Sequence, residues 1–316
     1  MEIQQLRMFL KVAEQASFTK AARDCGVSQP AISQQVAKLE TTLGRPLFER
    51  QGRQVALTEA GEMLRRRALQ IVSLVDDTAR LLRDDGETGK IVVSAIPTIA
   101  PYLMPGLLDA FHGGHPQARL EVNEEVTDVI LRRCALGEID VGVLALPASR
   151  GYLRFETLFE EELLLVTAAD HPLVGRGRVE LDDLRDLPFV LLDEAHCLSD
   201  DIRGFCRRRL FQPVTTGRVS QLATVQELVA QGFGISLIPE MAVRPDPDAR
   251  LRYRSLDGEK PFRTVTACWN PDRYQSRLML SFLETVKHGR DRNRRSGGAV
   301  AAGDGLRPSP SATPCR

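Results

Sequence analysis

Residues 17–43 form two short helical patterns that are joined by a glycine-containing turn, and this stretch limits the fold more than any other. Ser17 and Ser28 each stand where a side-chain oxygen can cap the first turn of a helix, and Gly26 separates the two helices. Inward-facing alanines in the first helix let the second one approach closely. The stretch predicts a helix-turn-helix, with one further helix before it at residues 3–15.

The second helix of this pair carries polar side chains on the face that packing does not use. They are Gln29, Ser33, Gln34 and Lys38. Short amides and hydroxyls near the start of a helix suit the base edges of a DNA major groove. Residues 46–58 predict a hairpin that turns at Gln51-Gly52, and its Arg50 and Arg53 suit phosphate contacts. The alternative is a three-helix bundle whose polar face is only solvated.

A long helix is predicted after the hairpin, because apolar residues recur at helical spacing for about 27 residues from Thr58. A helix of this length needs a partner for its apolar stripe, and a second copy of the same helix is the simplest partner. The alternative is that the helix packs on its own body. Residues 84–89, DDGETG, are expected to end the helix and to form a hinge.

Strands and helices alternate after residue 90, which predicts an α/β body on a mostly parallel sheet. The expected strands are 91–96, 118–125, 139–146, 163–169, 188–193, 234–239 and 264–270. The expected helices are 97–112, 127–137, 201–210, 220–231 and 273–289. Residues 147–151 look like a crossing between two small units, with a ligand cleft between them. The Gly, Pro, Ser and Arg bias from Asp291 onward predicts a disordered tail.

Charge is distributed unevenly although the net charge of the chain is zero. Residues 1–67 hold 11 Lys+Arg and 7 Asp+Glu, a net charge of +4, and the rest holds 31 and 35, a net charge of −4. A basic module on an acidic body is expected if that end binds nucleic acid. The charged N-terminus does not resemble a signal peptide, and no apolar run of about 18 residues occurs. We therefore expect a cytoplasmic protein without a membrane span, whose six cysteines are reduced by default.

Two cysteines, Cys197 and Cys206, lie nine positions apart in EAHCLSDDIRGFC, and His196 precedes the first of them. The spacing does not match the clustered ligands of a zinc site, so we expect no metal and no other cofactor. In a helix, nine residues cover roughly 13–14 Å of axis, whereas disulfide partners need Cα atoms within about 7 Å. The pair is therefore either two buried thiols or a switch whose closure remodels the helix.

Residues 18–61 closely resemble the winged helix-turn-helix of the LysR-type transcriptional regulators. The resemblance implies that Gln29, Pro30, Ser33 and Gln34 lie at DNA-reading positions and that Arg53 lies on the wing. It also implies a body that is similar to periplasmic binding proteins. The expected modules are a winged helix-turn-helix at 1–58, a linker and dimerisation helix at 59–86, an effector domain at 90–290 and a tail at 291–316. Within the effector domain, subdomain I takes about 90–147 and 266–290, and subdomain II about 151–265.

The family also implies partners. The linker helix pairs two subunits in such regulators, so we expect double-stranded DNA and a second copy of the chain as partners, in a homodimer or a homotetramer. RNA polymerase is a further partner if the protein activates transcription.

Two stretches of the body, IPTIAPYLMP at 96–105 and HCLSDDIRGFC at 196–206, resemble the OxyR regulators, which are the peroxide-sensing group of that family. By this resemblance Cys197 is the peroxidatic thiol and Cys206 the resolving thiol. The implied pocket residues are Thr98, His196 and Thr127. Oxidation would give a sulfenic acid and then a disulfide, and would activate oxidative-stress genes.

Two other functions remain open at this point. A small organic ligand could bind the interdomain cleft of a LysR-type regulator whose cysteines are structural. A cysteine-dependent enzyme would use Cys197 as its nucleophile, but the adjacent His196 rarely has the geometry of a base, so we do not expect an enzyme. Cys25, Cys134 and Cys268 are interpreted as packing residues.

Overall fold

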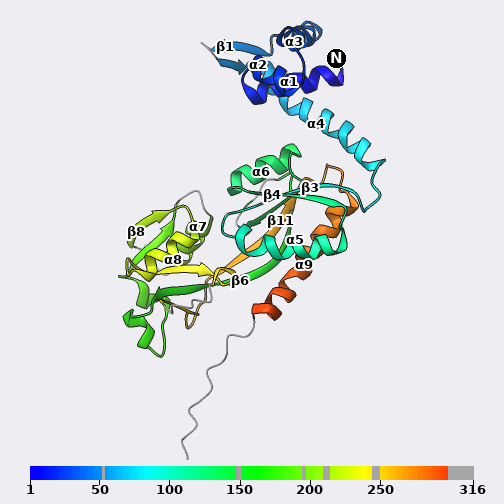
Figure 1. The fold of residues 1–316 in the computed structure, drawn as a ribbon. Helices are drawn as coiled ribbons and strands as arrows, with labels where there is room; N and C mark the ends of the chain where they lie inside the picture. The colour runs from blue at the N-terminus through cyan, green and yellow to red at the C-terminus, as the bar shows by residue number, and fades with distance from the viewer. Residues whose placement is uncertain are drawn as a thin grey trace, which may run out of the picture.

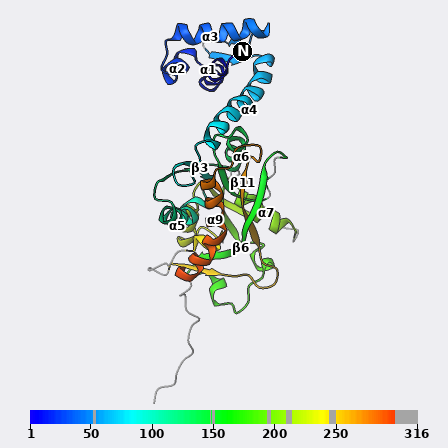
Figure 2. The same cartoon turned by 90° about the vertical axis from the view of Figure 1, so that its right-hand side faces the viewer.

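The computed structural model describes residues 1–51, 54–146, 148, 151–193, 197–208, 214–243 and 250–297. These residues form an N-terminal module, a long helix and an α/β body (Figure 1). The N-terminal module contains α1 (Ile3–Gln15), α2 (Phe18–Asp24), α3 (Gln29–Leu43), β1 (Phe48–Gln51) and β2 (Gln54–Leu57). The long helix is α4 (Glu59–Leu81). Figure 2 shows that α4 leads from the N-terminal module to the body.

The caps that the sequence predicts for the helix-turn-helix are present. The hydroxyls of Ser17 and Ser28 accept hydrogen bonds from the backbone N–H three residues further on, at 3.4 Å and 3.3 Å. Strands β1 and β2 pair antiparallel, with Phe48 opposite Leu57. The predicted hairpin is therefore confirmed, while Arg53 lies outside the described residues.

Helix α4 begins at its predicted cap, because the Thr58 hydroxyl accepts a hydrogen bond from the Gly61 N–H at 3.0 Å. It ends at Leu81, a few residues earlier than predicted, since Asp84 and Asp85 form turns with the residues that follow them. Its first half packs against α1, and Ala68 is fully buried there. Several of its apolar side chains stay exposed, namely Met63, Leu74, Val75 and Leu81.

The body contains two units. The first contains β3 (Gly89–Ala95), α5 (Ala100–Gly114), β4 (Ala118–Glu124), α6 (Thr127–Leu136), β5 (Val141–Ala145), β11 (Phe262–Trp269) and α9 (Arg277–Gly297). The second contains the short helices η1 (Pro172–Gly175), η2 (Leu181–Leu184) and η3 (Glu240–Ala242), with β7 (Pro188–Leu192), α7 (Cys197–Arg208), β8 (Val214–Val219), α8 (Leu222–Ala230), β9 (Ser236–Pro239) and β10 (Leu251–Arg254). Strand β6 (Arg154–Ala168) runs through both units (Figure 1).

The main sheet has the strand order β10-β6-β11-β5-β3-β4, and β9 pairs with the far half of β6. β3 pairs in parallel with β4 and β5, whereas β6 and β11 run antiparallel to each strand they pair with. The prediction of a mostly parallel sheet is therefore wrong, and the sheet is mixed. The reason is that β6 carries the chain into the second unit and β11 returns it beside β6.

Strand β6 differs most from the sequence prediction, which starts a strand at residue 163. It begins nine residues earlier, and Phe159 pairs with Val265 of the first unit while Leu163 pairs with Pro239 of the second. The charged run at residues 160–162 hides this continuity in the sequence. The short strands β8 and β10 are also absent from the prediction.

The C-terminal prediction needs one correction. Helix α9 continues to Gly297, seven residues into the segment predicted to be disordered, and arginines suit the negative C-terminal end of a helix. Residues 298–316 lie outside the described part. Among the described helices, none is long and apolar enough to cross a membrane.

Each unit of the body has its own hydrophobic core, and two of the predicted packing cysteines lie in the first. Cys134 of α6 and Cys268 of β11 are fully buried in the first core, with their Sγ atoms 3.8 Å apart. Hydrogen bonding to Cys268 and burial raise the pKa of Cys134 far above its ordinary value. Both cysteines are therefore packing residues of the first core, as predicted.

Gly142 of β5 provides space for this thiol pair, which a substitution can test. A Cβ atom there would lie 2.4 Å from Cγ2 of Ile130 and 2.8 Å from Sγ of Cys268. We expect Gly142→Ala to lower the free energy of unfolding by about 1–3 kcal/mol through overpacking, measured by urea denaturation. Gly113→Ala on α5 is the control, because its new methyl group meets open space. Equal stability of the two variants would contradict this packing.

Candidate functional site

Thr98 and Thr127 lie at one edge of the first unit's sheet. β3 and β4 are parallel neighbours, with Ala95 opposite Glu124, so both strands end at the same edge. Thr98 lies in the turn between β3 and α5, which begins at Ala100 rather than at the predicted residue 97. Thr127 is the first residue of α6 and is half-buried. Parallel α/β sheets bind ligands at this edge, near helix N-termini.

Thr98 is held by Arg263 of β11. The guanidinium donates one hydrogen bond from Nη1 to the Thr98 hydroxyl at 2.8 Å and another from Nη2 to its carbonyl oxygen at 3.1 Å. The hydroxyl oxygen thus accepts a charge-assisted bond, and no described residue accepts a hydrogen bond from its proton. A buried threonine in this state can donate to a small oxygen-containing molecule.

The same arginine forms a buried ion pair with Glu161 of β6. Arg263 Nε donates to Glu161 Oε1 at 2.6 Å, and the two side chains are 0% and 3% exposed. The other carboxylate oxygen accepts a hydrogen bond from the Met241 N–H at 3.2 Å. Since Met241 lies in η3, this network joins the second unit to Thr98 of the first.

The two cysteines of the sequence prediction both lie in α7. Cys197 is its first residue, and Cys206 is fully buried in the core of the second unit. Burial raises the pKa of Cys206 to about 11. Cys206 is a free thiol, and the nine-residue helical spacing matches the expectation that the pair cannot bond while the helix stands. His196 and the Cys197 side chain lie outside the described part, so their place relative to Thr98 stays a prediction.

The predicted DNA-reading residues lie along the first turns of α3. Gln29, Pro30 and Gln34 are exposed, and Ser33 is partly exposed. Gln29 Nε2 donates a hydrogen bond to the Ser33 hydroxyl at 2.8 Å. These side chains form one polar patch, and Arg53 cannot be placed beside it because it is not among the described residues.

The described residues contain no group of three or more His, Cys, Asp or Glu side chains that could hold a metal ion. A pocket of about 580 Å³ lies between α4 and the first unit rather than beside Thr98.

Two protein families match the two parts of this chain. The LysR substrate binding domain matches residues 84–290, and the bacterial regulatory helix-turn-helix protein of the lysR family matches residues 3–62. The chain is a LysR-family transcriptional regulator. Its N-terminal module is accordingly a DNA-binding helix-turn-helix, and its body is an effector domain. This family consists of transcriptional regulators and not of enzymes.

The regulator is similar to several OxyR proteins. Over 274 residues it is 35% identical to the DNA-binding transcriptional dual regulator OxyR of Escherichia coli (strain K12). The match covers 86% of this chain and 90% of that protein. A full-length OxyR variant from Pseudomonas aeruginosa has a TM-score of 0.75 at 29% identity, covering 92% of this chain and 94% of that one. A peroxide-bound OxyR variant from Corynebacterium glutamicum has a TM-score of 0.61 at 32% identity, covering 95% and 97%.

Arg263 and Glu161 are the site residues that the sequence interpretation missed. They lie 102 positions apart, and each stands in a strand beside other charged or polar residues. The pattern of β11 gives no signal for Arg263, because residues of both parities are buried there, among them Val265 and Thr266.

The ion pair can be tested by removing one charge. Glu161→Gln leaves Arg263 buried with an incomplete partner, and we expect the free energy of unfolding to fall by about 3–5 kcal/mol. Glu160→Gln, at the exposed neighbouring position, is the control and should change it by less than about 0.5 kcal/mol. Urea denaturation of the full-length protein measures both, and similar values for the two variants would refute a structural role for the pair.

The raised pKa of Cys206 gives a second test. At pH 8 a thiol of pKa about 11 is ionised in roughly one molecule in a thousand, and the ionised share grows about tenfold per pH unit. We expect iodoacetamide to label Cys206 very slowly in the folded reduced protein and rapidly in denaturant. Labelling followed by peptide mass spectrometry measures this, and fast labelling of the folded protein at pH 8 would contradict the burial of this thiol.

Proposed function

We propose that this regulator senses hydrogen peroxide by reversible formation of a Cys197–Cys206 disulfide and then activates oxidative-stress genes. The observation that carries the proposal is the asymmetry of the two cysteines within α7. Cys197 is the first residue of the helix, where the dipole favours a thiolate, while Cys206 is fully buried with a raised pKa. One thiol is thus suited to attack peroxide, and the other stays protonated until it is exposed.

The chemistry consists of two balanced steps. The Cys197 thiolate attacks one peroxide oxygen, the O–O bond breaks, and the second oxygen leaves as hydroxide, which takes a proton to form water. The Cys206 thiol then attacks the sulfenic sulfur of Cys197, the S–O bond breaks, and a second water leaves as the disulfide forms. Thr98 is assigned as donor to the departing oxygen, with His196 and Thr127 as the other pocket residues.

Closure of the disulfide requires α7 to unwind. The two cysteines are separated by roughly 13–14 Å of helix axis, and they must come within about 7 Å at Cα. The fully buried Cys206 must also leave the second core. This refolding supplies the conformational change that the sensor passes to the rest of the protein.

The DNA-binding half of the proposal assigns base contacts to Gln29, Pro30, Ser33 and Gln34, with Arg53 on the wing. The exposed apolar side chains of α4 support pairing with a second copy of the chain, and two such dimers would form a tetramer. RNA polymerase is the further partner of the activated form. The proposed modules are residues 1–58, 59–86 and 90–290. The proposed location of the protein is the cytoplasm.

Peptide mass mapping tests this function. The purified reduced protein is treated with near-stoichiometric hydrogen peroxide, and we expect a Cys197–Cys206 disulfide that is absent from Cys197→Ser and from Cys206→Ser. Cys25→Ser is the matched control, because this thiol lies in the DNA-binding module and should leave the disulfide intact.

The contrary result is two free thiols after peroxide treatment in a protein that still binds DNA. It would reject peroxide sensing and favour a small organic ligand for the body, with both cysteines serving as packing residues.

A further inference from the structure

The carboxylate of Asp77 fastens α4 to the body. Asp77 Oδ2 accepts hydrogen bonds from Arg273 Nε at 2.6 Å and from the Tyr274 N–H at 3.0 Å, and Oδ1 accepts one from Arg273 Nη2 at 3.0 Å. Burial alone would raise the pKa of Asp77, but the bonds from Arg273 and Tyr274 outweigh it and hold that pKa below its ordinary value. This side chain is only 8% exposed, so salt screens the pair weakly.

The residue before Asp77, Asp76, binds the DNA-binding module. Asp76 pairs with Arg7 of α1, which belongs to the DNA-binding module. Successive residues of a helix point about 100° apart, so the two carboxylates leave α4 in different directions. At this one turn, α4 is therefore bound to the DNA-binding module on one side and to the body on the other.

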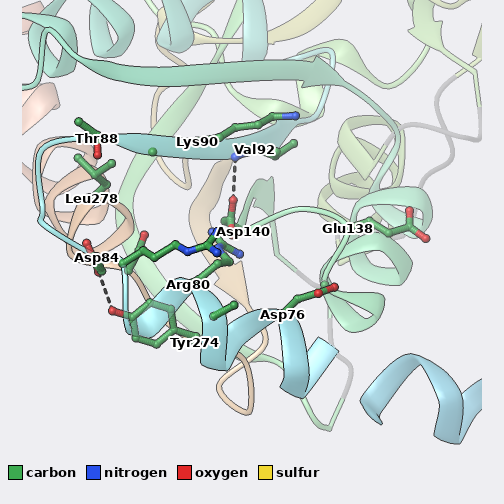
Figure 3. A pocket seen from close by; sticks show the side chains of 15 residues that line it. Asp76, Arg80, Asp84, Thr88, Lys90, Val92, Glu138, Asp140, Tyr274 and Leu278 are labelled. Carbon is green, nitrogen blue, oxygen red and sulfur yellow. Dashed lines mark hydrogen bonds and ion pairs between the residues drawn. The ribbon is translucent and has the colours of Figure 1, made fainter. Parts of the chain in front are cut away.

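Further contacts fix the end of α4. Asp84 accepts hydrogen bonds from the Tyr274 hydroxyl at 2.6 Å and from the Arg277 N–H at 2.8 Å. Arg80 donates to Asp140 at 3.0 Å, and Asp140 accepts a bond from the Val92 N–H at 2.8 Å. Figure 3 shows Tyr274 directed at Asp84, and Asp140 between Arg80 and Val92. These contacts fix the position of the end of α4 on the first unit.

Two elements lead from the sensing site to Arg273. Strand β11 carries Arg263 at its start, and the loop that follows its end carries Asn270 and Arg273. Helix α6 starts at Thr127 and ends beside the same loop. Asn270 Nδ2 donates to the Ala135 carbonyl at 3.1 Å, and Arg273 Nη1 donates to the Leu136 carbonyl at 3.3 Å. The last carbonyls of α6, which carry its negative dipole end, are therefore bound by this loop.

Gly137, directly after α6, provides the space for the Arg273 guanidinium. A Cβ atom at this position would lie 1.3 Å from Arg273 Nη1, and the glycine has a φ of +69°. The place of Arg273 is therefore set by the end of α6 as much as by β11.

We propose that Asp77 and Arg273 are the positioning residues through which a change in the sensing body redirects α4 and the DNA-binding module that α4 carries. The proposal rests on the proposed function for the nature of that change, which is disulfide formation. The contact itself is a property of the reduced protein. Helix α6, which begins at Thr127, and strand β11, which carries Arg263, both lead to the loop of Arg273. Among the described carboxylates, Asp77 is the only one that accepts two hydrogen bonds from this guanidinium.

The first experiment tests the contact between Asp77 and Arg273, called the joint below, without peroxide or DNA. Amide hydrogen exchange of residues 77–81 is compared in the full-length reduced wild-type protein, Asp77→Asn and Gly137→Ala, which displaces the guanidinium without changing any charge. Asp182→Asn is the control, because this exposed carboxylate in η2 has only a surface partner. We expect exchange about tenfold faster in the first two variants and unchanged in the control. Unchanged exchange in both would overturn the joint.

The second experiment measures whether the contact between Asp77 and Arg273 is needed for the DNA footprint to change on oxidation. DNase I footprints of reduced and peroxide-treated protein are compared on duplexes that the wild-type protein selects from a random library. In Asp77→Asn we expect the Cys197–Cys206 disulfide to form at the wild-type peroxide dose, while the reduced and oxidised footprints become the same. A residue that only stabilises the fold would lower the melting temperature and leave the footprint difference intact.

The outcomes separate the two proposals. A wild-type-sized footprint change in both Asp77→Asn and Gly137→Ala would overturn the positioning role. Absence of the disulfide from the wild-type protein would reject peroxide sensing instead, and the exchange measurement would still decide whether the joint exists.

Discussion

Arg263 of β11 and Glu161 of β6 face each other on paired antiparallel strands, and both side chains are almost fully buried. Placing two such ions in a protein interior costs several kcal/mol per ion, which their attraction repays only when further hydrogen bonds complete their shells. Here Thr98 and the Met241 N–H complete them. The pair therefore needs both units of the body in their present positions. It stabilises the pairing of the two strands, and the same guanidinium orients Thr98, which the proposed function assigns to the peroxide pocket.

The buried network of Arg263, Glu161 and Thr98 contrasts with helix α7, which carries the two cysteines. The sheet beneath Thr98 is held by buried charges and paired strands, whereas α7 is one amphipathic helix that closes over the second core through residues such as Ile202 and Cys206. In the proposed sensor, the fixed network would bind the oxidant and α7 would unwind once the Cys197 thiol has reacted. Strand β6, which pairs with strands of both units, would keep the units together during that change.

Local signals in the sequence were sufficient for the N-terminal module. Caps at Ser17, Ser28 and Thr58 depend on neighbouring residues, and the structure contains each of them. The helix predicted at 201–210 contains Cys206 but not Cys197, and α7 begins four residues earlier, at Cys197. The mixed sheet and the Arg263–Glu161 pair could not be read in this way, because they depend on β6 meeting a strand about 100 positions away. The contact between Asp77 and Arg273 could not be predicted for the same reason, since one aspartate in a charged helix does not indicate which arginine it binds.

The proposed disulfide requires α7 to lose its helix while β6 and β11 stay paired. Amide hydrogen exchange of residues 198–206, compared with that of both strands before and after stoichiometric oxidation, measures this difference. We expect α7 to lose its protection in the oxidised protein, with protection in β6 and β11 unchanged. A disulfide-bonded protein whose α7 amides remain as protected as in the reduced form would contradict the unwinding of α7.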